Sequence, residues 1–130
     1  MMRTFLPYLL VGFGGFLGAN ARFLVGSWVG SAVGMRFPLG TLIINVSGSF
    51  LLGIIGTLIA ERVVSHPEYV QFGLAVGFLG AYTTFSTFSY ENHAILLDGE
   101  WWTAAMNIVL SVALGLVAVR LGVIVTKAWL

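Results

Sequence analysis

The sequence contains no cysteine and very few charged residues, and both absences narrow what the protein can be. Without cysteine, disulfide bridges and thiolate metal sites are excluded. Only 8% of the 130 residues are charged, whereas a soluble globular domain has roughly 25%. The net charge is +1 and basic residues form no cluster, so the sequence does not favour nucleic-acid binding.

Apolar residues take the place of the missing charges. The chain is 58% hydrophobic, with a mean hydropathy of +0.99. A membrane-spanning helix needs about 20 mostly apolar residues. We therefore predict an all-α integral membrane protein with one domain, residues 1–130, and four transmembrane helices at about 4–34, 38–60, 69–97 and 101–129. Four small helices enclose little space, so the protein is either a helper subunit or an oligomer that builds its site between copies.

Small residues recur at every fourth position of the first apolar segment. The stripe comprises Gly14, Gly18, Arg22, Gly26, Gly30 and Gly34. Such spacing lets another helix backbone approach closely, so the stripe is predicted to be a packing face. Arg22 lies on this face, and the sequence leaves two interpretations open. Its side chain either extends to the nearer membrane surface or places a cation at the mouth of an anion pathway.

Polar residues follow the same spacing in the second and fourth segments. Thr41, Asn45 and Ser49 share one helix face, and so do Asn107 and Ser111. An asparagine at membrane depth is costly unless it is hydrogen-bonded. Asn45 either makes an interhelical hydrogen bond, which is the more common use, or donates to a permeating anion.

The third segment contains the most unusual stretch, from Gly77 to Ser89. It combines two glycines, three phenylalanines (two of them three residues apart) and several hydroxyl residues inside an apolar run. Glycine lowers helix propensity, and Ser/Thr side chains can satisfy backbone groups that a break releases. We predict an interrupted helix near Gly80–Thr83, with free carbonyls on one side of the break and free N–H groups on the other. The alternative is a continuous helix whose hydroxyls bond to its own backbone.

The polar groups within the segments favour ion binding over catalysis. There is no nucleophile–base pair, carboxylate pair or metal-ligand cluster, so enzyme activity is not expected. Hydroxyl, amide and guanidinium groups all donate hydrogen bonds, and the edge of a phenyl ring is partly positive. Together they favour an anion over a cation. The roles of Glu91 and His93 at the end of the third segment are left open.

Two motifs resemble the CrcB/Fluc fluoride channels. The first is Gly-Thr-Leu-x-x-Asn, ending at Asn45, and the second is Gly-Phe-x-Gly-x-x-Thr-Thr-Phe-Ser-Thr-Phe-Ser, from Gly77 to Ser89. The resemblance covers essentially the whole chain. It implies a fluoride-selective channel of the bacterial plasma (inner) membrane that passively exports fluoride from the cytoplasm. It also implies an antiparallel, dual-topology homodimer with two pores in the lipid bilayer.

The resemblance also implies roles for individual residues. Phe85 and Phe88 match phenylalanines whose ring edges face fluoride, and Arg22 matches a vestibule arginine. Gly80 and Thr83 match positions whose backbone carbonyls hold a structural sodium ion (Na+) at the dimer interface. The residues assigned to the fluoride pore are Asn45, Phe85, Phe88, Thr41, Ser86, Thr87, Asn107 and Ser111. Ala81 and Tyr82 depart from the family pattern, where a second glycine and an aliphatic residue are usual.

Two other classes compete with this interpretation. A small multidrug-type exporter is also a short, four-span, dual-topology dimer, but that class uses a glutamate in its first span. Residues 4–34 contain no acidic residue. A non-conducting membrane assembly subunit would explain the glycine stripe but not Asn45 or the hydroxyl residues.

Overall fold

A computed structural model describes residues 2–33 and 37–130, and within these ranges every regular element is a helix. The elements are α1 (Met2–Val33), α2 (Leu39–Ala60), α3 (Pro67–Tyr69), η1 (Val70–Leu79), α4 (Gly80–Tyr82), α5 (Phe85–Leu97) and α6 (Trp101–Trp129). The predicted all-helical fold is confirmed. Gly34, the predicted end of the first span, lies outside the described residues.

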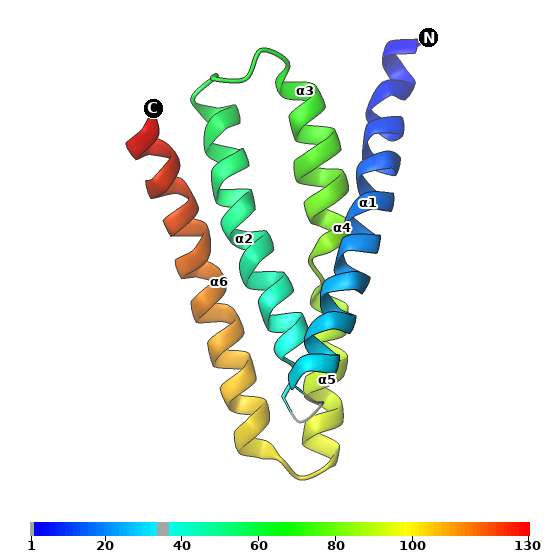
Figure 1. Cartoon of the computed structure of the whole chain (residues 1–130), viewed down its shortest axis with the longest axis vertical. Coiled ribbons are helices and arrows are strands. Elements are labelled where there is room, and N and C mark those ends of the chain that lie inside the picture. The colour runs from blue at the N-terminus through cyan, green and yellow to red at the C-terminus, as the bar shows by residue number, and fades with distance from the viewer. Residues whose placement is uncertain (1, 34–36) are drawn as a thin grey trace.

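Three of these helices are continuous, long and apolar enough to cross a membrane, namely α1, α2 and α6. The shortest of them, α2, has 22 residues and is therefore about 33 Å long, which matches a hydrocarbon core of about 30 Å. The remaining segment, the third along the chain, extends from α3 to α5 and runs along the length of the bundle but is broken part-way (Figure 1). The protein is accordingly a multi-pass membrane protein.

The helices form two closely packed pairs joined through α2. α6 packs along α2, and α1 packs along η1. In Figure 1 the four segments lie side by side in the order α6, α2, the broken segment and α1. The broken segment therefore lies between α2 and α1, and α2 can reach its backbone.

Close packing of α1 on η1 depends on glycine. A Cβ atom added at Gly14 would collide with the carbonyl of Gly73, and one added at Gly18 would collide with the carbonyl of Phe78. These two members of the glycine stripe thus form the predicted packing face. Gly30 does not belong to it, because a Cβ there would meet open space.

Glycine also lets α2 approach α6. A Cβ on Gly53 would collide with the carbonyl of Val119, and one on Gly122 would collide with the carbonyl of Phe50. Backbones this close gain dispersion contacts that lipid tails cannot match. The close backbone contact therefore fixes the position of α6 relative to α2.

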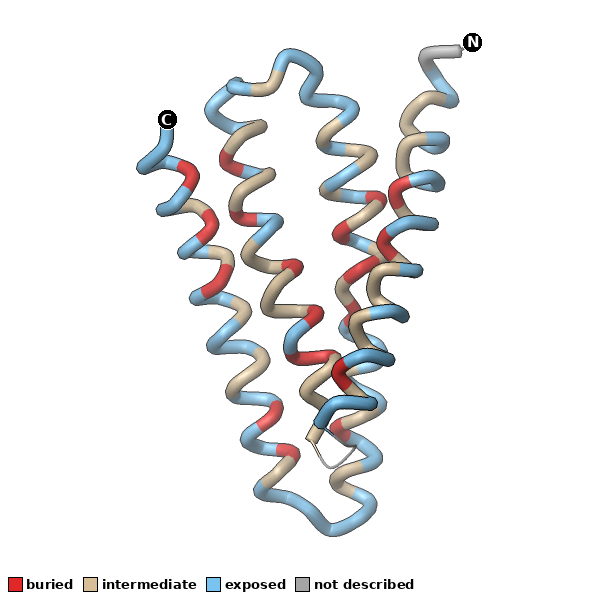
Figure 2. Tube along the Cα trace, viewed as in Figure 1, coloured by how far each residue is buried: buried red, intermediate tan, exposed pale blue. Residues whose placement is uncertain are grey.

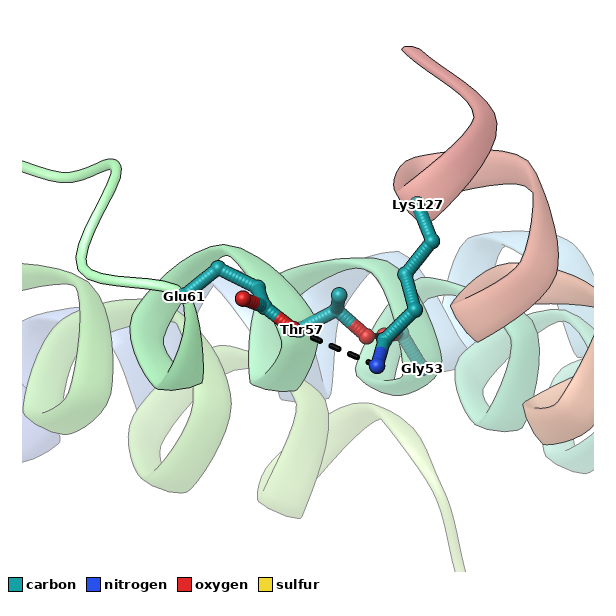
Figure 3. Close-up of polar contacts among 4 residues, drawn as sticks. All are labelled: Gly53, Thr57, Glu61 and Lys127. Carbon is teal, nitrogen blue, oxygen red and sulfur yellow. Dashed lines mark hydrogen bonds and ion pairs between the residues drawn. The ribbon is translucent and has the colours of Figure 1, made fainter. Parts of the chain in front are cut away.

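A threonine and an ion pair complete one end of the α2–α6 contact (Figure 3). Thr57 donates its hydroxyl to the Gly53 carbonyl at 2.7 Å. One turn further along, Glu61 pairs with Lys127 of α6, with 3.2 Å between Oε1 and Nζ. Both charged side chains are about half exposed, so this pair contributes at most about 1 kcal/mol.

Most apolar side chains point outward. Buried residues follow the inward faces of the helices, and exposed residues cover their outer faces (Figure 2). Only 11% of the apolar window of α1 is buried inside the chain. A soluble protein could not tolerate so much exposed apolar surface, whereas lipid or a second protein chain covers it without cost.

The predicted interruption of the third segment is present, and it begins after Tyr82, the last residue of α4. Gly80 itself is helical, with φ −62° and ψ −36°. The chain becomes extended at Thr83 (φ −80°, ψ 160°) and Thr84 (φ −154°, ψ 121°) and then re-enters a helix. The position of the break is therefore decided by the threonines and by what binds them.

Replacing Gly18 by alanine should destabilise the protein, because the new methyl group would collide with the Phe78 carbonyl. Overpacking of this kind costs about 1–3 kcal/mol. The matched control is Gly12→Ala in the same helix, where a Cβ meets nothing within 4 Å. Thermal unfolding in detergent, followed by tryptophan fluorescence, should show a lower Tm for Gly18→Ala only. Equal Tm values for the two variants would contradict the close approach of α1 and η1.

Candidate functional site

The break in the third segment is held open by a side chain of α2. Asn45 accepts a hydrogen bond from the Thr84 N–H at 2.8 Å and donates one to the Thr84 carbonyl at 3.0 Å. In a continuous helix the Thr84 N–H would donate to the carbonyl of Gly80 instead. Asn45 therefore replaces the helical hydrogen-bond partner of the Thr84 N–H, and the Gly80 carbonyl oxygen no longer accepts that bond.

Thr84 starts the second half-helix. Its Oγ1 accepts a hydrogen bond from the Thr87 N–H at 3.2 Å, which is an N-cap of the kind that threonine commonly provides. A continuous helix would pair that N–H with the Thr83 carbonyl. The cap therefore releases a second carbonyl oxygen, three residues after the first.

The two released carbonyls belong to Gly80 and Thr83, the pair that the family resemblance assigns to sodium. Neutral carbonyl oxygens suit a small hard cation. Within residues 2–33 and 37–130, no group of His, Cys, Asp or Glu side chains could hold a metal ion. The donor chemistry at the break thus fits an alkali-metal ion held by backbone oxygens, and binding itself stays a prediction.

Gly48 of α2 leaves room for the extended threonine. A Cβ atom on Gly48 would collide with Cγ2 of Thr83. The Thr83 hydroxyl turns the other way and donates to the Leu79 carbonyl at 2.9 Å. The backbone of Thr83 is therefore confined between α2 and the end of the first half-helix.

A hollow of about 350 Å³ opens beside the break, between α2, the broken segment and α6. The predicted site residues that line it are Asn45, Gly80, Thr83, Phe85, Phe88 and Ser111. The two phenyl rings lie one helical turn apart, with centroids 5.8 Å apart and planes inclined at 41°. Polar side chains and two phenyl rings therefore line one space.

A second, larger hollow of about 1290 Å³ lies between α1, the start of α2 and α5. It is lined by the predicted residues Arg22, Thr41 and Thr87, and by Glu91. Thr84 lines both hollows, so the break separates them. Arg22 thus lines an open space, which is expected if it lies at the mouth of an anion pathway and is not required if it only extends to the membrane surface.

Glu91 is engaged on one oxygen only. The Thr41 hydroxyl donates to its Oε1 at 2.7 Å. Its Oε2 is buried and has no hydrogen-bond partner among the described residues. The sequence left the role of Glu91 open, and the structure places it on the lining of the larger hollow, hydrogen-bonded to α2.

Two predicted pore residues lie outside both hollows. Ser86 is exposed on the surface of α5. Asn107 is only 1% exposed. Its amide donates to Oδ1 of Asn92 at 3.1 Å, and its oxygen faces the Ser111 hydroxyl at 3.3 Å. Within one chain, Asn107 therefore links α5 to α6 and does not line a hollow.

Sequence reasoning missed the residues that organise this region. Asn92 receives the Asn107 hydrogen bond and donates to the Phe88 carbonyl at 2.7 Å. Thr84 both caps α5 and binds Asn45. The signal for Asn92 was present: an asparagine at the end of one span and another at the start of the next are placed to pair.

Residues 9–123 match the protein family described as CrcB-like protein, Camphor Resistance (CrcB). A fluoride-specific ion channel FluC from Solibacter usitatus is 45% identical over 122 residues, covering 94% of this chain and 99% of the relative. Relatives of the same name from Geobacter metallireducens and Hydrogenovibrio crunogenus are 46% and 48% identical over 113 and 124 residues. The match to the Geobacter protein covers 87% of this chain and 90% of the relative. The match to the Hydrogenovibrio protein covers 94% of this chain and 93% of the relative. The chain with the broken third segment therefore belongs to the CrcB-like family.

Proposed function

We propose that this protein is a fluoride-specific ion channel of the bacterial plasma membrane and that it exports fluoride passively, without enzymatic turnover. One observation carries the proposal. In a member of a family whose relatives are named fluoride-specific ion channels, the amide of Asn45 and the rings of Phe85 and Phe88 line the same hollow at a helix break.

The chemistry of this hollow suits a small, strongly hydrated anion. The Asn45 amide has two N–H donors, and the Thr84 carbonyl takes one of them. The Ser111 hydroxyl lies 3.3 Å from Asn107 Oδ1, which is long for an O–H···O bond, so it can rotate toward an anion at little cost. Several weak donors in series bind an ion without trapping it, as conduction requires.

The direction of transport follows from the membrane potential. A potential of 100 mV, negative inside, favours the exit of one negative charge by about 2.3 kcal/mol. Arg22 lines the larger hollow together with the carboxyl residues Glu91, Asp98 and Glu100, so its guanidinium offers an anion one local partner and does not make the whole hollow positive. We assign this hollow to the vestibule through which fluoride enters.

We propose that a second copy of the chain completes the pores. Phe85 is 79% exposed, and Ser86, Thr87 and Ser89 are exposed on the same half-helix. Lipid tails offer no partners to hydroxyl groups. An antiparallel, dual-topology homodimer would cover these residues, place each α5 against the polar face of its partner and create two pores.

We further propose that a structural sodium ion joins the two copies. The carbonyls of Gly80 and Thr83 would hold it, because the Asn45 and Thr84 side chains take the N–H groups that would otherwise occupy them. The ion would supply a fixed positive charge at the dimer interface and bind the backbone of both breaks together.

Purified protein in liposomes should release fluoride rapidly when a fluoride gradient and a potassium diffusion potential are applied. Chloride should be retained, as expected for a relative of proteins that are named fluoride-specific channels. A fluoride electrode and a chloride electrode measure the two fluxes. Proton-coupled efflux of organic cations without fluoride flux would indicate an exporter, and the absence of any flux would indicate an assembly subunit.

Phe85→Ile and Phe88→Ile should each reduce fluoride flux. The loss of a ring edge removes about 1 kcal/mol of favourable interaction, which corresponds to roughly a fivefold decrease in rate. The control is Phe13→Ile, at an exposed position of α1, which should conduct normally. Each variant is first checked for an intact dimer by size-exclusion chromatography. Normal flux in both Phe85 and Phe88 variants would refute ring-edge coordination.

Replacing sodium by N-methyl-D-glucamine on both sides of the membrane should reduce fluoride flux or dissociate the dimer. A bulky organic cation cannot fit between backbone carbonyls, so the charge at the interface would be lost. Flux and dimer content are compared with a parallel sample that is returned to sodium. If neither changes, the carbonyls at the break do not bind sodium.

A further inference from the structure

Tyr82 lies directly before the break and is tied to α2. Its hydroxyl is 2.9 Å from the Ser47 hydroxyl. The side chain is only 7% exposed, and its ring stacks on Phe78 with a centroid distance of 5.9 Å and an angle of 11°. Tyr82 and Ser47 line neither of the two hollows. Their hydrogen bond therefore does not contact the proposed ion path.

The direction of this hydrogen bond follows from proton counting. The Ser47 hydroxyl donates to the carbonyl of Ile44 at 3.1 Å. A serine hydroxyl has one proton to donate, so Ser47 accepts from the Tyr82 O–H. The Tyr82 hydroxyl thus donates to Ser47, and the Ser47 hydroxyl donates to the α2 backbone. These two hydrogen bonds fix the orientation of both side chains.

α2 consequently holds the broken segment on both sides of the extended residue Thr83. Ser47 binds the residue before it, and Asn45 binds the residue after it through two hydrogen bonds. Thr83 packs over Gly48 between the two attachments. Three nearly consecutive residues of α2 therefore set the path of the backbone through the break.

We propose that Tyr82 is a positioning residue that, through its hydroxyl bond to Ser47, fixes the backbone at the break and orients the carbonyls of Gly80 and Thr83. The role of Tyr82 in cation binding rests on the proposed sodium site. Its role in fixing the backbone at the break is independent of that site. An aliphatic residue at this position could not form this hydrogen bond, because it has no hydroxyl group.

The first measurement is hydrogen exchange at the Thr84 amide, in the protein reconstituted in nanodiscs. Tyr82→Phe keeps the ring and its stacking but removes the hydroxyl. Exchange should accelerate roughly fivefold, the factor expected for one neutral hydrogen bond. Ser47→Ala should do the same, and the double variant should exchange no faster than either single one, because both remove one interaction.

Two controls carry the same chemical changes elsewhere. Tyr8→Phe alters an exposed tyrosine of α1. Ser31→Ala alters a serine that, like Ser47, donates to a carbonyl three residues earlier, at 2.8 Å. Both should leave Thr84 exchange unchanged. Unchanged exchange in Tyr82→Phe, or full additivity of the Tyr82 and Ser47 variants, would overturn the inference.

The second measurement is thermal stability as a function of sodium concentration. A ligand that binds only the folded protein raises Tm with concentration, so Tyr82→Phe should need roughly fivefold more sodium for the same rise. If sodium fails to stabilise the unaltered protein, the sodium site is refuted while the exchange data still decide the role of Tyr82. If sodium stabilises both proteins at the same concentrations, Tyr82 does not orient the carbonyls.

Discussion

The two hydrogen bonds between Asn45 and the backbone of Thr84 are the interaction on which the rest of the site depends. A helix interior in a membrane has no water to satisfy a released backbone group. A break can persist only where a side chain replaces the lost partner. The asparagine does this for both the N–H and the carbonyl of one residue, and the Thr84 hydroxyl then caps the next half-helix. The Thr84 N–H and carbonyl and the Thr87 N–H therefore keep hydrogen-bond partners at the break.

Close packing makes this interaction possible. Asn45 has a short side chain, so α2 must run close beside the broken segment to reach its backbone. Gly48 allows that approach at the break itself, while Gly53 and Gly122 hold α2 against α6. On the other side, glycines of α1 admit the backbone of η1. The chain uses glycine to place backbones where side chains would otherwise separate them, and the polar residues then have partners within reach.

The same arrangement leaves part of the candidate site exposed at the surface of the chain. The break faces a hollow lined by amide, hydroxyl and phenyl groups, yet Phe85 and its neighbouring hydroxyl residues are exposed. The outer faces of α1 and α6 are apolar and suit lipid. The exposed face of α5 is polar and does not. This polar, exposed surface is the basis on which we propose a second copy of the chain as its partner.

The sequence by itself determined the helices, because apolar length and the scarcity of charge leave a membrane protein few alternatives. It also determined that the third segment breaks within the motif from Gly77 to Ser89, since glycine and threonine weaken a helix there, and it identified Asn45 as a residue in need of a partner. Only the tertiary structure decided which groups meet. Asn45 and Thr84 are 39 residues apart, Thr41 and Glu91 are 50 apart, and Ser47 and Tyr82 are 35 apart. Periodicity within one helix assigns a side chain to a face. The partner opposite that face depends on how deeply two helices approach and how they are rotated, and these are set by the packing of the whole bundle.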